Sequence, residues 1–137
     1  MKIHIDGQTL SKRLPAGNAG IYRATITGRK IATAKSSGNP KMQLELTLNS
    51  EGPNTDVKTI GKCVYDNITF TEDSIWRANL LYGAVTGGQN IPKADYTADE
   101  FFNLLWSVCQ NRQLIIEVTD EVYEGVARPR VTRYQAQ

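Results

Sequence analysis

The chain has 137 residues, of which 40% are hydrophobic and 22% are charged, and its formal net charge is +2. This length suits one domain with its own hydrophobic core, and the composition excludes a disordered or fibrous protein. No apolar run reaches the roughly 18 residues that a membrane-spanning helix needs. The first residues reach Asp6 before an apolar block of signal-peptide length has formed. We therefore expect a soluble, cytoplasmic protein.

Charge is distributed unevenly along the chain. Residues 1–62 contain ten basic and four acidic residues, residues 63–124 contain three and ten, and residues 125–137 contain three and none. Such segregation indicates one basic surface formed by the first and last segments and one acidic surface formed by the middle segment. Chance clustering on solvated faces is the alternative.

The first strand is predicted over residues 21–31, where apolar and polar residues alternate. Tyr22 and Ile26 lie on one face of this pattern, and Arg23 and Arg29 lie on the other. An alternation of period two is typical of a half-buried strand. The pattern predicts one face in the core and one basic face.

The next segments predict a long hairpin and a third strand. Residues 34–40 are rich in Ser, Gly, Asn and Pro and predict a loop. Residues 41–49 alternate again, with four apolar residues inward, and residues 57–68 are rich in β-branched residues. Within this third strand, Gly61 predicts a bulge or sharp bend of a curled sheet.

Two helices are predicted after the third strand. The first begins near Ser74, carries an apolar stripe that includes Trp76, and ends at Gly87. The second begins with a capping-box signal over residues 97–100 and carries a heavy apolar load that includes Trp106. We expect both tryptophans to pack in the core.

Residues 113–122 and 126–134 predict two final strands joined by a tight turn. The whole chain, residues 1–137, is expected to form one domain, with a breaker-rich N-terminal arm over residues 1–19. Three strands, a helical insert and two strands are the layout of the OB fold. We therefore expect a mainly β protein, a five-stranded Greek-key barrel with its helices between strands 3 and 4.

Catalytic chemistry finds little support in the sequence. His4 is the only histidine, and no phosphate-binding glycine motif is present. A structural zinc site normally takes four Cys or His ligands, which the chain lacks, so Cys63 and Cys109 are expected to be reduced core thiols. Carboxylates that could hold a divalent ion cluster at predicted helix starts, where capping and the helix dipole explain them. We expect no catalytic residues, no metal site, no cofactor and no enzyme.

Binding of single-stranded nucleic acid finds more support. Such proteins combine a groove of Lys and Arg with aromatic rings on which bases stack. In an OB fold, the ligand face is formed by strands 2 and 3, by the loop between strands 1 and 2, and by the loop between strands 4 and 5. Alternation places Arg128, Arg130 and Tyr134 on one face of the last strand, and Lys58 and Lys62 on one face of the third. The predicted contact residues are Arg23, Arg29, Lys35, Asn39, Lys41, Lys58, Lys62, Tyr65, Tyr123, Arg128, Arg130 and Tyr134.

Five short segments resemble small phage and prophage proteins of replication and recombination modules. These segments are residues 14–17, 20–24, 35–39, 74–76 and 121–125. Proteins of that family are regarded as OB-type single-stranded DNA-binding proteins. The resemblance implies sequence-nonspecific binding that protects single strands during phage DNA replication or recombination. Because the last residues are not acidic, recruitment of replication or recombination proteins would use another surface, such as the acidic middle segment.

The sequence leaves one alternative function open. A protein-interaction or structural β-barrel accessory protein of a phage would use the same basic face to dock an acidic protein. A preference for single-stranded over duplex DNA would separate the two functions. Formation of a homo-oligomer is also left open.

Overall fold

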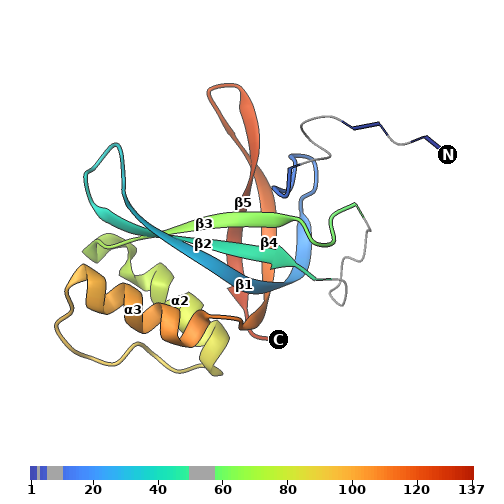
Figure 1. Ribbon diagram of the computed structural model, residues 1–137. Coiled ribbons are helices and arrows are strands. Elements are labelled where there is room, and N and C mark those ends of the chain that lie inside the picture. Colours follow the sequence, from blue (N-terminus) through green and yellow to red (C-terminus); the bar gives the residue numbers. More distant parts are fainter. Residues whose placement is uncertain (3, 6–10, 50–57) are drawn as a thin grey trace.

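The protein is described by a computed structural model that covers residues 1–2, 4–5, 11–49 and 58–137. Five antiparallel strands form one sheet in the order β3-β2-β1-β4-β5 (Figure 1). The strands are β1 (Gly20–Thr33), β2 (Pro40–Leu48), β3 (Cys63–Thr69), β4 (Gln113–Tyr123) and β5 (Val126–Gln135). The sheet curls until Cα atoms of its two edge strands, β3 and β5, come within 8 Å of each other. The fold is therefore mainly β and barrel-like, as predicted.

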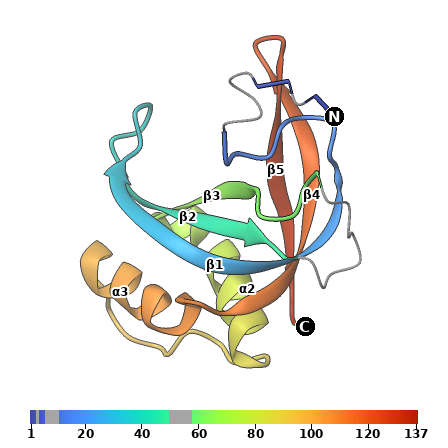
Figure 2. The ribbon, with the colours of Figure 1, turned by 45° about the vertical axis from the view of Figure 1, so that its right-hand side comes forward.

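The helical insert lies between β3 and β4, where the sequence predicts it. It consists of a 3-10 turn η1 (Glu72–Ser74), α2 (Ile75–Thr86) and α3 (Ala98–Cys109). Gly87 ends α2 in the left-handed region, and Thr97 and Glu100 form the predicted capping box at the start of α3. Both helices pack under the curled sheet (Figure 2). Each helix has 12 residues, so no helix in the described part of the chain is long and apolar enough to cross a membrane.

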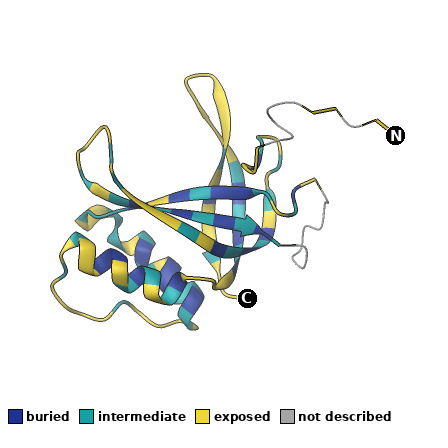
Figure 3. Ribbon diagram, in the orientation of Figure 1, coloured by how far each residue is buried: buried dark blue, intermediate teal, exposed yellow. Residues whose placement is uncertain are grey.

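The core lies between the inward face of the sheet and the two helices (Figure 3). Alternate residues of β1 and β2 supply its centre, in agreement with the predicted alternation; Tyr22, Ala24, Ile26, Met42, Leu44, Leu46 and Leu48 are all at most 2% exposed. Phe101 and Leu105 of α3 close the core from below. Cys63 and Cys109 are free, buried thiols, and burial raises the pKa of Cys109 to about 12.

A β-bulge at Thr27 reverses the orientation of the end of β1. Pairing shifts between Ile26 and Gly28, so that Arg29 lies opposite the core residue Leu44. Cross-strand partners share a face of the sheet. The prediction that Arg29 shares the outward face with Arg23 was therefore wrong, because the extra residue in the bulge shifts the alternation by one.

A second bulge at Thr132 has the same effect on β5. Val131 pairs with Val118, but the next paired residue, Arg133, lies opposite Glu117. Tyr134 consequently pairs with the core residue Ile116 and packs against the core. The prediction that Tyr134 shares a face with Arg128 and Arg130 was wrong.

The start of the third strand and the packing of α2 also differ from the prediction. β3 begins at Cys63, whereas Gly61 has a positive φ of 81° in the preceding turn and forms no bulge within a strand. Lys58 and Lys62 therefore precede the strand and do not share one of its faces. Trp76 is 63% exposed, because Ala78, Leu81, Tyr82 and Val85 supply the core side of α2.

The N-terminal arm lies against the free edge of β3. The backbone N–H of Leu14 donates to the carbonyl of Cys63 at 2.8 Å, and the N–H of Cys63 donates to the carbonyl of Lys12 at 2.7 Å. The side chain of Leu14 is 1% exposed, which anchors the arm. Further along, the N–H of Gly17 donates to the carboxylate of Asp120 on β4. The arm thus crosses the gap between the two ends of the curled sheet.

Candidate nucleic-acid interface

The outward face of β1, β2 and β3 carries two rows of cross-strand neighbours. In one row, Gly28 lies opposite Glu45, which lies opposite Tyr65. In the adjacent row, the neighbours are Lys30, Gln43 and Asn67. Because paired residues share a face, these side chains form a continuous polar floor with one aromatic ring.

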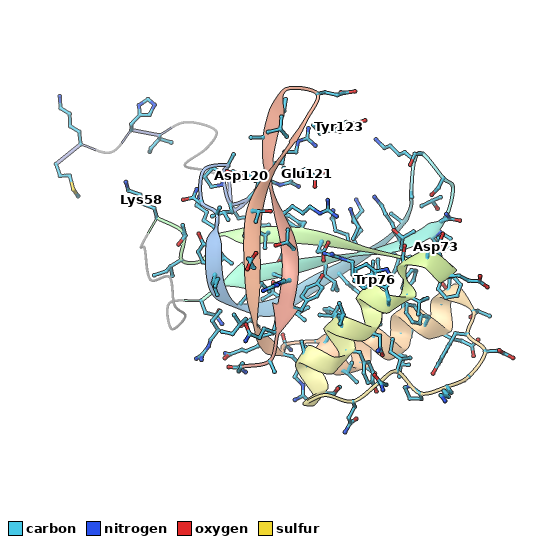
Figure 4. The ribbon with its side chains drawn as sticks, turned by 180° about the vertical axis from the view of Figure 1, so that it is seen from behind. Lys58, Asp73, Trp76, Asp120, Glu121 and Tyr123 are labelled. Carbon is cyan, nitrogen blue, oxygen red and sulfur yellow. The ribbon has the colours of Figure 1, made fainter. Side chains whose placement is uncertain are left out.

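Two loops rise on the same side of this floor. The β1–β2 loop and the β4–β5 hairpin both project from the sheet, and β2 and β3 pass between them (Figures 1 and 2). A tight turn at Glu124 and Gly125, both with positive φ, forms the hairpin tip. Tyr123 and Glu121 project from the hairpin in the same direction (Figure 4). The hairpin contributes Tyr123, Arg128 and Arg130 to a hollow beside β3.

Three adjoining hollows meet at Tyr65 and form one surface feature, which we call the central groove. One lies over Lys30, Gln43 and Glu45, one lies between the N-terminal arm and the hairpin, and one lies between β3 and the hairpin. The last encloses about 420 Å³. The polar and charged side chains that line it are Arg13, Arg29, Lys30, Gln43, Glu45, Tyr65, Asp66, Asn67, Arg77, Glu121, Tyr123, Arg128 and Arg130.

Tyr65 is held in place by its neighbours. Its hydroxyl donates to Oε2 of Glu45 at 3.3 Å, and the guanidinium of Arg13 lies over its ring. Partial burial, reinforced by the carboxylate of Glu45, raises the pKa of Tyr65, so the ring stays neutral at physiological pH. Its hydroxyl orientation and ring position are fixed before any ligand arrives.

Glu45 is the carboxylate on the groove floor. Lys12 donates to its Oε2 and Thr27 donates to its Oε1, both at 2.8 Å. The hydrogen bond from Lys12 lowers the pKa of Glu45, and the bond from Thr27 adds to this effect. The charge of this carboxylate is therefore largely compensated by the arm.

The other carboxylates at the central groove are also paired. Glu121 accepts a hydrogen bond from Arg130, and Asp66 accepts one from Arg77 at 2.7 Å. Lys30 and Arg128, in contrast, have no carboxylate within 4.0 Å in the described part of the chain. These two cations, at opposite ends of the groove, are available to an anionic ligand.

The structure brings five of the twelve predicted contact residues to this groove. Tyr65, Tyr123, Arg128 and Arg130 line it, and Arg29 lines the hollow over Lys30. Lys41 lies on the same outward face, one row closer to the β1–β2 loop, opposite Thr69. Lys35 is exposed on that loop.

The remaining predicted residues lie elsewhere or have structural roles. Arg29, at the edge of the groove, also has a structural role on α3, where it donates to Asn103 and lies over the ring of Trp106. Asn39 closes the β1–β2 loop, because its carbonyl accepts from the N–H of Ala34. The others outside the groove are Arg23 on the outward side of β1, Lys58 and Lys62 in the turn before β3, and Tyr134 on the core side of β5.

Sequence reasoning missed several lining residues, among them Arg13, Lys30, Gln43 and Asn67. Lys30 faces outward beside Gln43 because the bulge shifts the alternation after Ile26. Gln43 and Asn67 lie opposite each other on the outward face, and the alternation of β2 contained that signal. Arg13 reaches the groove because it lies on the N-terminal arm. The sequence signal that this arm is anchored is the neighbouring Leu14, an apolar residue directly before Pro15.

No protein-family model matches the sequence, and no curated protein is significantly similar to it. Within the described residues, no three His, Cys, Asp or Glu side chains lie close enough together to hold a metal ion. The geometry and charge of the central groove therefore carry the functional inference.

Proposed function

We propose that this protein binds single-stranded DNA, without sequence specificity, in the central groove of an OB barrel. The observation that carries the proposal is the position of Tyr65. Its ring lies at the meeting point of three hollows, between the cation Lys30 at one end and Arg128 at the other. Cations along a path and aromatic faces within it are the two parts that single-strand binding requires.

The topology supports an OB barrel as the scaffold. β1 pairs with both β2 and β4, the edge strands β3 and β5 converge, and the helices join β3 to β4. In that fold, ligands bind across strands 2 and 3 between the loops 1–2 and 4–5. The central groove crosses β2 and β3 and reaches the β4–β5 hairpin, which supports this comparison.

The residues of the groove suit a sequence-tolerant mode of binding. Lys30 and Arg128 would neutralise phosphates and release counterions, which gives affinity but reads no base. The rings of Tyr65 and Tyr123 would stack bases, and every base has a ring face. Tyr123 is 67% exposed at the hairpin, so it is accessible without rearrangement of the core.

The biological role that we propose is protection of single strands during phage DNA replication or recombination. It rests on the resemblance of five short segments to proteins of such modules. Binding would then be the whole mechanism, with no bond made or broken in the DNA.

The test is fluorescence anisotropy with labelled oligo-dT and a duplex of equal length, over a series of salt concentrations. We expect tighter binding to oligo-dT than to the duplex, and an affinity that falls steeply as salt rises. Arg128→Ala should weaken binding and lower the slope of log K against log salt by roughly 0.7, the value for one phosphate contact on a single strand. Lys93→Ala, which removes an exposed cation from the helical side of the molecule, is the matched control and should change neither quantity.

Two results would contradict the proposal. Equal affinity for duplex and single strand would show that the groove does not select single strands. Absence of binding to oligo-dT at low salt would favour an acidic protein as the partner of the basic face.

A further inference from the structure

A second groove, which we call the lateral groove, lies between α2 and the C-terminal half of β5. It encloses about 390 Å³. The residues that line it are Trp76, Arg77, Leu80, Thr132, Arg133, Tyr134 and Gln135. Figure 4 shows Trp76 on α2, next to β5 and below the hairpin that carries Tyr123.

Folding does not explain why Trp76 is on this face. Trp76 and Leu80 are one helical turn apart, and they are 63% and 55% exposed. The core side of α2 is already supplied by other apolar residues of the helix, among them Leu81 and Val85. An exposed tryptophan beside a second exposed apolar residue is typical of a binding surface.

The charges at the lateral groove select an anionic ligand. The charged residues that line it are Arg77 and Arg133. Arg77 is engaged by Asp66, but Arg133 has no carboxylate within 4.0 Å among the described residues. Glu117, the cross-strand neighbour of Arg133, accepts a weak hydrogen bond from Thr132 instead. Arg133 thus presents a charge to solvent at the rim of the lateral groove.

The lateral groove and the central groove share one lining side chain, Arg77. This side chain lines both the hollow between β3 and the hairpin and the lateral groove. Its Nη2 donates to the carbonyl of Val131 at 2.8 Å, which holds it against β5 between the two grooves. A single strand of DNA that leaves the central groove at Arg130 can therefore follow β5 to Trp76.

We propose that the lateral groove is a second subsite for single-stranded DNA, in which a base stacks on Trp76 and a phosphate contacts Arg133. This inference rests on the proposed function of the central groove and gives the direction in which the bound strand continues. Bound DNA would pass the β4–β5 hairpin and descend along β5 toward the C-terminus. Leu80 would cover the edge of the stacked base.

The test compares a short labelled oligo-dT of about 6 nucleotides with a longer one of about 15, lengths that bracket the site sizes of OB folds. Trp76→Ala should weaken binding of the longer oligonucleotide by about fivefold or more, the effect of losing one base stack. Binding of the shorter oligonucleotide should not change. Trp76→Tyr, which keeps an aromatic face, should restore most of the lost affinity, and Arg133→Gln should lower the salt slope for the longer oligonucleotide only.

Fluorescence provides an independent readout. In a Trp106→Phe background, Trp76 is the only tryptophan, and its emission should be quenched by the longer oligonucleotide and not by the shorter one. An unchanged affinity of Trp76→Ala for the longer oligonucleotide, or an equal loss for both lengths, would overturn the lateral subsite while leaving the central groove intact. Failure of the unaltered protein to bind either oligonucleotide would overturn the proposed function itself.

Discussion

Arg13 of the N-terminal arm lies over the ring of Tyr65, with its guanidinium carbon 4.8 Å from the ring centroid. The guanidinium therefore occupies a position that a stacked base would need. At an exposed site such a cation–π contact is worth about 0.5–1 kcal/mol, whereas a base–aromatic stack is worth roughly 1–3 kcal/mol. A base can therefore displace Arg13, and the released cation can then contact a phosphate.

The first prediction concerns the ring of Tyr65. Tyr65→Ala should weaken oligo-dT binding by about 5- to 150-fold, because one stacking platform is lost. Tyr65→Phe should bind almost as well as the unaltered protein, since the hydroxyl contacts Glu45 and is not needed for stacking. Both affinities are measured by anisotropy at one salt concentration, and thermal unfolding confirms that each variant is folded. An unchanged affinity of Tyr65→Ala would place the ring outside the DNA path, and equal losses for Ala and Phe would show that the hydroxyl makes the contact.

The second prediction concerns Glu45 on the floor of the groove. Glu45→Gln should strengthen oligo-dT binding by about two- to fivefold, because the variant removes a negative charge from the strand path and releases Lys12. Asp95→Asn, an equivalent change in the exposed loop between α2 and α3, is the matched control and should leave the affinity unchanged. Weaker binding by Glu45→Gln would show that its carboxylate positions Tyr65 or Lys12 for the ligand.

Glu45 also gives a third prediction, on the pH dependence of stability. The hydrogen bond from Lys12 lowers the pKa of Glu45 below its ordinary value of 4.5. The pKa of Glu45 is lower in the folded state than in the unfolded state, so the ionised carboxylate stabilises the fold at pH values above the unfolded-state pKa. This stabilisation is lost as the pH falls through the folded-state pKa. Urea unfolding should show the unaltered protein slightly more stable than Glu45→Gln at pH 7. The difference should shrink as the pH falls below 4.5 and vanish once the folded-state carboxylate is protonated; a constant difference would show that the two residues act through packing.

The alternation of the strands predicted most of the fold but not its irregularities. Met42 and Leu44 point inward as the pattern requires, and the capping box of α3 begins where the sequence places it. The two bulges were missed, although each shifts the alternation: Ile26 and Ile31 share a face at an odd spacing, and so do Val131 and Tyr134. Arg29 and Tyr134 were therefore assigned to the wrong faces.

The candidate site depended on contacts between distant segments, and these were harder to predict. Trp76 was expected in the core because helical spacing alone does not distinguish the two apolar sides of α2. Arg13 reaches Tyr65 only because Leu14 anchors the arm on β3. Arg128 on the hairpin was easier to place beside β3, because a tight turn fixes its position relative to the strands.

The fourth prediction concerns the link between the edge strands. Arg77 of α2 donates to Asp66 on β3 and to the carbonyl of Val131 on β5, so one side chain joins both ends of the curled sheet. Arg77→Leu should lower the free energy of unfolding by about 3–5 kcal/mol, because it leaves the buried carboxylate of Asp66 without its partner. Adding Asp66→Asn should recover part of this loss. Urea denaturation measures both changes, and a loss below about 1 kcal/mol for Arg77→Leu would show that water replaces the guanidinium.

The last prediction concerns Tyr134, whose hydroxyl is buried and has no hydrogen-bond partner in the described part of the chain. A buried polar group without a partner costs free energy, whereas its removal without change of shape is neutral or stabilising. Tyr134→Phe should therefore leave the free energy of unfolding unchanged or raise it by up to about 1 kcal/mol. The variant keeps the ring beside Arg77, 5.4 Å from its guanidinium carbon, so oligo-dT affinity should not change. A clear loss of affinity would mean that this hydroxyl turns toward the DNA on binding, as the alternation of β5 alone would suggest.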